Sequence, residues 1–274
     1  MLAVALGLLS GLSWGVADFF GGVASRRAAA LAVVVLSQAV GLLLILAIVG
    51  VTRPDVPPAR DLAFAAAAGA VGLIGLAAFY RAMSVGTISL IAPITALGAA
   101  VPIVVDLVAG AIPGPLSLFG MVVALGGAAL AARAPGPASR RGIGLAVVAA
   151  VGFGGFFSLL AEGADTSPAW AILTARGTSV PIGLIALVAA GTGIAMARRT
   201  AAFVVASGCL DVTANLLFAA GSQRGAVSVV AVLGSLYPVT TVMLAATLLH
   251  ERLGRLQALG AAIALAGVVL IAAG

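Results

Sequence analysis

The sequence predicts an all-α membrane protein with about ten transmembrane helices, arranged as two inverted five-helix repeats. Of its 274 residues, 63% are hydrophobic and only 8% are charged, whereas soluble domains carry about 25% charged residues. The apolar runs are continuous and about 20 residues long, which is the length of a helix that crosses a bilayer. A pattern of glycines and leucines also recurs at a spacing of about 140 residues.

Clusters of Arg, Pro, Asp and Gly divide the chain into ten candidate spans. Their centres fall near residues 12, 40, 71, 96, 124, 152, 180, 210, 237 and 264. The connections are short, as in "VTRPDVPPARD" and "RAPGPASRRG", so we expect one membrane domain without an inserted soluble domain. The start, "MLAVALGLLSG", has no basic segment and no cleavage signature. It therefore reads as a first span and not as a cleaved signal.

The repeat is clearest between residues 111–130 and 251–270. At an offset of 140, Gly120 aligns with Gly260 and Gly127 with Gly267, and several leucines agree in the same order. We expect one five-helix repeat over residues 1–135 and a second over 140–274. Because five is odd, the second half lies upside down relative to the first, which is the usual basis of alternating access in transporters.

The last 50 residues carry a family resemblance. The recognisable features are Ser228, the Tyr237-Pro238 pair, Glu251-Arg252-Leu253, Gly260 and Gly267, with Trp14-Gly15 and "SVGTISLIAPITAL" in the first half. These stretches resemble an EamA-type transporter of the drug/metabolite transporter superfamily. The resemblance implies ten helices and transport of small metabolites, but it names no substrate. It departs where the first half has Ala111-Ile112 in place of Glu251-Arg252.

Asp18 is the first candidate functional residue, because it is a charge inside an apolar span. Gly7, Gly11 and Gly15 recur every four residues on the same helix and predict close packing against a neighbouring helix. Asp18, and Trp14 four residues before it, then lie on or beside that packed face. An inward-facing acid in a membrane helix indicates a proton or cation site. The alternative is a structural hydrogen bond or an ion pair with Arg176.

The eighth span offers a polar stripe. Ser207, Asp211 and Asn215 recur every four residues and so share one helix face. The stripe indicates either a wet cavity or polar contacts between helices. Arg176 lies inside the seventh span and requires an anion, for which Asp18 and Asp211 are the candidates. A substrate carboxylate is the functional alternative.

Two prolines interrupt spans. Tyr237-Pro238 in the ninth span and Pro93 in the fourth predict broken helices, which in transporters expose backbone groups to substrate; a static kink is the alternative. Tyr237 and Trp14 would wall a cavity or pack in the core. Asp106, near the end of the fourth span, is expected at the membrane interface.

The function we expect is secondary active transport of a small metabolite, an amino acid or a drug-like solute. Export across the cytoplasmic membrane of a bacterium, by alternating access and coupled to protons at Asp18 or Asp211, is the favoured form. A flippase for lipid-linked substrates on the same fold is the nearer alternative; a non-transporting scaffold or an intramembrane enzyme is the more distant one. The expected partners are a small molecule and the lipid bilayer, with a homodimer kept as an option.

We expect neither catalysis nor a cofactor nor a metal site. The G-x-S-x-G match at residues 11–15 lies inside a span, without the strand-to-helix turn that the motif needs. All 14 basic residues are arginines, and most of them flank apolar runs, which indicates membrane topology and not nucleic-acid binding.

Arginine placement leaves the orientation open. The odd-numbered loops carry Arg26, Arg27, Arg81, Arg133, Arg140, Arg141, Arg198, Arg199, Arg252 and Arg255, and the even-numbered loops carry Arg53, Arg60 and Arg224. The positive-inside rule therefore places the odd loops in the cytoplasm and both termini outside. The family resemblance implies the reverse.

Overall fold

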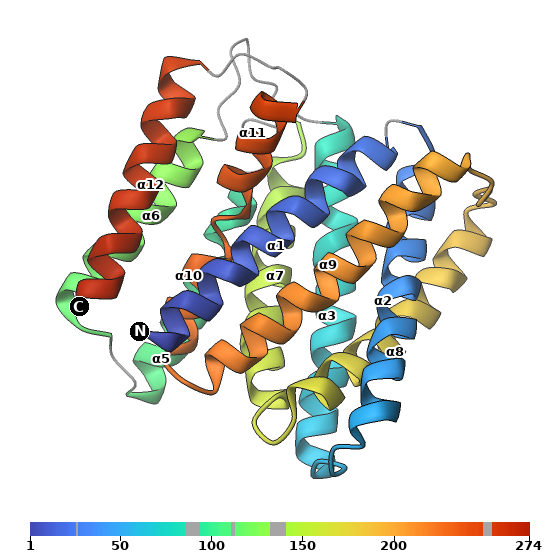
Figure 1. Cartoon of the computed structure of the whole chain (residues 1–274), viewed down its shortest axis with the longest axis horizontal. Helices are drawn as coiled ribbons and strands as arrows, with labels where there is room; N and C mark the ends of the chain where they lie inside the picture. Colours follow the sequence, from blue (N-terminus) through green and yellow to red (C-terminus); the bar gives the residue numbers. More distant parts are fainter. Residues whose placement is uncertain (26, 86–93, 111–112, 132–140, 249–253) are drawn as a thin grey trace.

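The computed structural model describes residues 1–25, 27–85, 94–110, 113–131, 141–248 and 254–274, and every regular element within them is a helix. Six of these helices are long and apolar enough to cross a membrane: α1 (Leu2–Ser25), α2 (Ala30–Thr52), α3 (Ala59–Val85), α7 (Ile143–Gly163), α8 (Pro168–Ala189) and α9 (Arg198–Ser222). The other helical segments are η1 (Leu97–Ala99), α5 (Ala100–Ala109), α6 (Pro115–Ala131), α10 (Val227–Gly234), α11 (Tyr237–Leu248) and α12 (Arg255–Ala273), and Figure 1 shows their arrangement.

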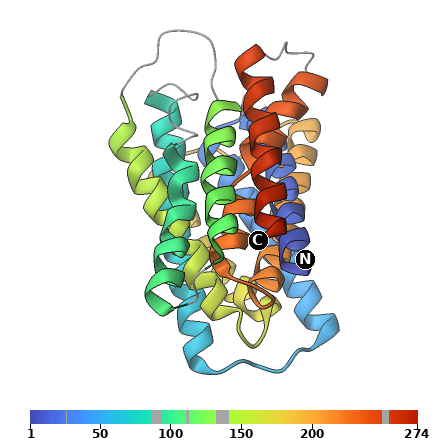
Figure 2. The ribbon, with the colours of Figure 1, turned by 90° about the vertical axis from the view of Figure 1, so that its left-hand side faces the viewer.

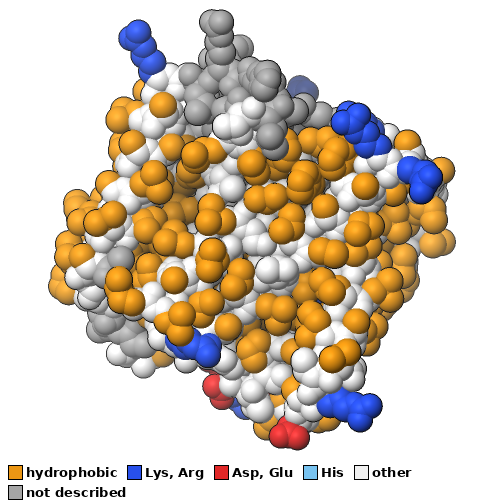
Figure 3. Space-filling model, viewed as in Figure 1, with side chains coloured by type: hydrophobic (Ala, Val, Ile, Leu, Met, Phe, Trp, Pro, Cys, Tyr) orange, Lys and Arg blue, Asp and Glu red, His pale blue; other side chains and the backbone are white. Residues whose placement is uncertain are grey.

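The surface is that of a multi-pass integral membrane protein. Charged side chains on the visible face gather at the two ends of the molecule, and hydrophobic side chains cover the band between them (Figure 3). Large apolar residues in this band are mostly exposed, such as Leu43 at 67%, Val122 at 70% and Ile185 at 70%. Such a surface is unsuited to water and matches a hydrocarbon environment. The all-helical membrane fold expected from the sequence is therefore confirmed.

The two ends differ in charge. We call the end formed by the turns 53–58, 164–167 and 223–226 the lower end, as it appears in Figure 1, and the end that holds residues 27–29 and 190–197 the upper end. The exposed acids Asp55, Glu162 and Asp165 lie at the lower end. The exposed described residues of the upper end include Arg27, Arg198 and Arg199. The arginine bias between odd and even loops is thus a bias between two faces of the molecule.

The helices pack in pairs that are distant in sequence. The main partners are α1 with α9, α3 with α7, and α6 with α12, and the last pair stands side by side at one edge in both Figure 1 and Figure 2. The glycine face of α1 approaches α10 and α11 as predicted: a Cβ added to Gly11 would lie 2.6 Å from the carbonyl oxygen of Leu233. A Cβ on Gly15 would lie 2.7 Å from the carbonyl oxygen of Tyr237. Only glycine permits backbones to come this close.

The ninth span is broken, as Tyr237-Pro238 predicted. Helix α10 ends at Gly234 and α11 begins at Tyr237, so Ser235 and Leu236 separate two half-helices. Pro238 stands in the first turn of α11, where a missing N–H costs no helical hydrogen bond. The corresponding prediction for Pro93 lies outside the described residues, as do Glu251-Arg252-Leu253 and the boundary between the two expected repeats.

Asp106 corrects an expectation. It is 6% exposed, not placed at the water–lipid interface, and its Oδ2 accepts a hydrogen bond of 2.8 Å from the backbone N–H of Ser228. The residue before α10, Ala226, supplies no side-chain cap. A carboxylate from α5 therefore takes the place of an N-cap, where it also favours the positive end of the helix dipole.

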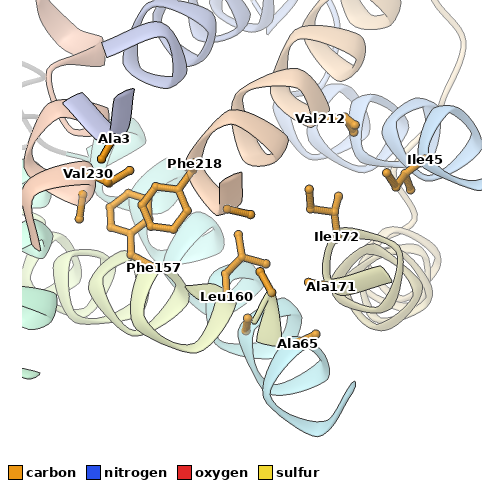
Figure 4. Packing of buried hydrophobic residues seen from close by; sticks show 14 residues of the cluster. Ala3, Ile45, Ala65, Phe157, Leu160, Ala171, Ile172, Val212, Phe218 and Val230 are labelled. Atoms are coloured by element: carbon orange, nitrogen blue, oxygen red, sulfur yellow. The ribbon is translucent and has the colours of Figure 1, made fainter. Parts of the chain in front are cut away.

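The main apolar core fills the lower half of the molecule. We call this cluster the plug; its large members include Phe157, Leu160, Ile172, Phe218 and Val230, all 7% exposed or less. Figure 4 shows Phe157 of α7 and Phe218 of α9 side by side near Val230, with ring centroids 5.0 Å apart. The plug fills the space between the helices at their lower ends.

Candidate functional site

A cavity of about 160 Å³ lies in the middle of the helix bundle. Helices α1, α2, α3, α7, α8, α9 and α11 all contribute to its wall. The wall contains every site residue predicted from the sequence: Asp18, Asp211, Arg176, Trp14, Ser207, Asn215 and Tyr237. The structure thus brings together seven residues that are spread over more than 200 positions of the chain. Their role in binding or proton coupling stays a prediction.

Arg176 pairs with Asp211 and not with Asp18. Its Nη2 donates to Oδ2 of Asp211, and its Nη1 donates to Oε1 of Gln38 over 3.1 Å. The Ser179 hydroxyl donates to the same Gln38 oxygen over 2.8 Å. The Arg176 side chain is only 11% exposed and that of Asp211 is 30% exposed. A buried guanidinium needs such a partner, because an unpaired charge in this environment is costly.

Asp18 faces the cavity without a partner. Within the described part of the chain, its carboxylate makes neither a hydrogen bond nor an ion pair, so its predicted structural alternative, an ion pair with Arg176, is wrong. Asp18 is exposed although it lies within the first membrane span, because its side chain borders the open space of the cavity. This carboxylate is therefore available to a ligand or a proton.

The polar stripe of α9 faces the cavity, as one of the two interpretations of the sequence expected. Ser207, Asp211 and Asn215 all line it. The Asn215 side-chain N–H group donates to the backbone oxygen of Asp211 over 2.6 Å, while its own Oδ1 is buried and has no hydrogen-bond partner. A buried carbonyl oxygen without a donor is costly unless something else supplies one.

Aromatic side chains form much of the remaining wall. Trp14, Phe79, Phe153, Phe156, Phe157 and Tyr237 all border the cavity. The Trp14 ring lies 5.5 Å from that of Phe157 and 5.9 Å from that of Phe218, centroid to centroid. Trp14 therefore stands between the cavity and the plug below it.

Sequence reasoning missed Gln38, Ser179 and the phenylalanines of α7. Gln38 could have been found as the one amide in an otherwise apolar second span. The phenylalanines gave no contrast, because aromatic residues in an apolar span are also ordinary core residues.

The lower end is tied together by polar contacts below the plug. Arg60 at the start of α3 forms an ion pair of 2.5 Å with Glu162 at the end of α7. Nearby, the Thr166 hydroxyl donates to Asp61 over 2.6 Å, and the Gln223 side chain donates to the carbonyl oxygen of Ala164 over 2.6 Å. We call these contacts the lower latch. Together the latch and the plug close the cavity from the lower end.

The chemistry of the site is that of binding. In the described segments, no three His, Cys, Asp or Glu side chains lie where they could jointly hold a metal ion. The cavity instead offers a free carboxylate, a neutralised Arg–Asp pair, an unsatisfied amide oxygen and aromatic rings. This combination suits recognition of a small polar molecule with an apolar body.

Comparison with known proteins agrees with this arrangement. Residues 140–273 match the sequence model of the EamA-like transporter family. A solved structure titled "Crystal structure of protein" superposes with a TM-score of 0.78 at 16% identity, over 98% of this chain and 95% of that one. This likeness shows the fold alone. No match was found among curated protein sequences.

Proposed function

Because the chain belongs to the EamA-like transporter family, we propose that it moves a small metabolite across the membrane by alternating access between two inverted five-helix halves. In this proposal the shorter helices α5, α6, α12 and the pair α10–α11 also contribute crossings, which gives ten spans. The observation that carries the proposal is the central cavity, since its wall draws on helices of both halves and it is closed at one end only by the plug and the latch.

The α6–α12 interface supports the two-fold relation between the halves. A Cβ on Gly127 would meet the backbone nitrogen of Ala264 at 2.2 Å, and a Cβ on Gly267 would meet that of Ala124 at 2.4 Å. These two contacts exchange when 140 is added to or subtracted from each number. An interface in which residue i meets j and the equivalent of j meets the equivalent of i is the signature of two-fold symmetry.

The same exchange holds at the helices that line the cavity. A Cβ on Gly15 would meet Cβ of Thr240 at 2.4 Å, and one on Gly154 would meet Cβ of Val101 at 2.5 Å. Both members of the second contact are 139 positions from their counterparts in the first. The helix partners also exchange, because α1 packs on α9 as α7 packs on α3. These relations support an inverted repeat, the arrangement on which alternating access is usually built.

The size of the cavity supports a small solute over a lipid-linked one. Pockets for drug-sized ligands hold about 300–1,000 Å³, and the cavity here is about 160 Å³. Lipid-linked cargo would need a far larger space, so the flippase alternative has no specific observation in its favour.

Asp18 is the residue that we propose as the proton site. It is a carboxylate inside a membrane span, it faces the cavity, and no described residue neutralises it. Ionisable groups of this kind mark proton and ion pathways in membrane proteins. Proton entry would then drive export of the metabolite, which is the direction that we infer from the family resemblance, in a bacterial cytoplasmic membrane.

Transport and proton coupling are tested separately in proteoliposomes with a pH-sensitive dye inside. A panel of amino acids and small amines is added outside, and uptake of labelled compounds is measured alongside the internal pH. We expect at least one compound to enter and to change the internal pH with wild-type protein but not with Asp18→Asn. Asp165→Asn, an exposed acid at the lower end, is the control and should behave as wild type.

Each half of the proposal has its own refutation. If folded wild-type protein transports none of the panel, the transport proposal is contradicted. If a compound enters with no pH change and with equal rate in Asp18→Asn, transport stands and proton coupling at Asp18 is refuted.

A further inference from the structure

We propose that the cargo is a small organic cation, an amine whose charge rests on Asp18 and whose apolar body lies against the aromatic wall. The inference rests on the proposed transport function for its biological meaning, but it concerns binding and can be tested without transport. It narrows the expected cargo, because amino acids and organic acids carry a carboxylate that this cavity does not receive well.

The charges around the cavity support a cation. Three charged side chains line it among the described residues: Asp18, Arg176 and Asp211. Arg176 and Asp211 form an ion pair and so cancel each other. The cavity therefore presents one uncompensated negative charge when Asp18 is ionised. A cationic ligand would neutralise it, whereas an anionic ligand would add a second like charge.

Arg176 is already committed. Its Nη2 donates to Asp211 and its Nη1 to Gln38, and Ser179 donates to the same Gln38 oxygen. A substrate carboxylate would have to displace Asp211 from its pair and leave that acid unpaired. Removing the partner of a buried charge is costly, so the structure disfavours the substrate-carboxylate role considered for Arg176 from the sequence.

The unused polar groups include two acceptors of different strength. One is the Asp18 carboxylate, and the other is Oδ1 of Asn215, which is buried without a donor. A primary ammonium group carries three N–H donors and no acceptor. An amine therefore supplies donors of the kind that both of these oxygens lack.

The aromatic wall suits the rest of such a ligand. Trp14 lies one helical turn before Asp18 on α1, and Phe153, Phe156 and Tyr237 border the same space. Cations are attracted to the faces of aromatic rings, most strongly to Trp, and an apolar body gains by burial against them. An engineered cavity of about 150 Å³ holds one benzene molecule. The cavity here, at about 160 Å³, accommodates a ligand with about one ring.

Four matched probes test the charge preference. They are 2-phenylethylamine, phenylalanine, 3-phenylpropanoate and 2-phenylethanol, which share one ring and a short chain but differ in charge. Binding to the full chain in detergent is measured as the concentration-dependent rise of the unfolding temperature. We expect 2-phenylethylamine to bind at least about tenfold more tightly than each of the others, because a hydrogen bond to a charged group is worth more than one to a neutral group. The inference is overturned if the amine does not bind, or if phenylalanine or 3-phenylpropanoate binds equally well.

Variants place the interaction at Asp18. Asp18→Asn keeps the shape of the side chain and should weaken amine binding about tenfold or more, while binding of 2-phenylethanol should change less than twofold. Asp18→Glu keeps the charge and should restore part of the affinity, and Asp165→Asn should match wild type. Equal amine affinity in wild type and Asp18→Asn would overturn the inference. Because the ranking of the four probes by wild type is decisive alone, an unfolded variant does not rescue it.

Transport of the same probes separates this inference from the proposed function. If phenylalanine or 3-phenylpropanoate is the compound that binds and enters proteoliposomes, the amine inference fails and the transporter proposal stands. If the amine binds through Asp18 but no bound probe crosses the membrane, the transporter proposal fails and the amine site stands.

Discussion

Replacing Gly127 with alanine tests the packing of α6 against α12. The added methyl carbon would lie 2.2 Å from the backbone nitrogen of Ala264, which is 1.2 Å closer than the 3.4 Å at which ordinary contact begins. The obstructing atom belongs to the backbone of α12, so no side-chain rotation relieves the clash. The two helices must move apart at this point.

The expected cost follows from two opposing effects. Overpacking a well-packed contact costs about 1–3 kcal/mol. Alanine is a better helix former than glycine by about 0.8–1.0 kcal/mol, which offsets part of that cost. Gly127→Ala should therefore lower the free energy of unfolding by about 1–2 kcal/mol. Gly267→Ala should give a similar value, since its methyl would meet the nitrogen of Ala124 at 2.4 Å.

The neighbouring residue provides the control. Gly126 stands on the same helix, but a Cβ there would meet nothing within 4 Å. Gly126→Ala should leave the protein as stable as wild type or slightly more stable. Reversible unfolding in mixed detergent micelles, followed by circular dichroism, measures all three variants. If Gly126→Ala and Gly127→Ala lose the same stability, the close approach of α6 and α12 is not what constrains position 127.

Three further changes test other contacts. Arg176→Gln removes the partner of Asp211 and should cost about 2–3 kcal/mol, less than the 3–5 kcal/mol of a fully buried pair, because Asp211 is 30% exposed; adding Asp211→Asn should recover more than half of that loss in the same unfolding assay, and no recovery would contradict the pairing. Asp106→Ala removes the acceptor of the Ser228 N–H and should cost about 1–2 kcal/mol, with faster amide exchange confined to the start of α10; unchanged exchange there would refute the capping role. Glu162→Gln breaks the ion pair with Arg60, whose side chains are 51% and 59% exposed, so it should change stability by less than about 1 kcal/mol. The same change should nevertheless speed labelling of Ser37→Cys in the cavity by a membrane-impermeant maleimide added at the lower end, in a Cys209→Ser background; an unchanged labelling rate would show that the latch does not control access.

The positions of the spans followed from the sequence because they depend on local properties. Apolar run length decides where a membrane helix lies, and the expected centres near 40, 152 and 210 fall within α2, α7 and α9. The break before Tyr237 was equally local, since proline acts on its own turn. Convergence of the site residues was also foreseeable in kind, because polar groups in membrane helices avoid lipid.

The pairing inside the site depended on distances that periodicity does not give. Asp18 and Asp211 were equal candidates for Arg176, and only the packing of α8 beside α2 and α9 decides for Asp211 and adds Gln38. Asp106 was misplaced for a similar reason, since its partner is a backbone N–H more than 100 residues away. These features depend on tertiary contacts between helices, and a single sequence contains no direct signal for them.

The lower latch makes the two ends of the molecule energetically unequal. In a perfectly symmetric inverted repeat, the state closed at one end and the state closed at the other would have the same free energy. Arg60 and Glu162 close the lower end, but the positions 139 residues away from them are Arg199 and Val23. Closing the upper end would therefore form no equivalent pair and would gather Arg27, Arg198 and Arg199, whose like charges repel. The degeneracy of the two states is broken toward the one seen here. If the arginine-rich end faces the cytoplasm, as the positive-inside rule predicts, the resting protein holds its cavity on the cytoplasmic side of the plug, ready for solute that is to leave the cell.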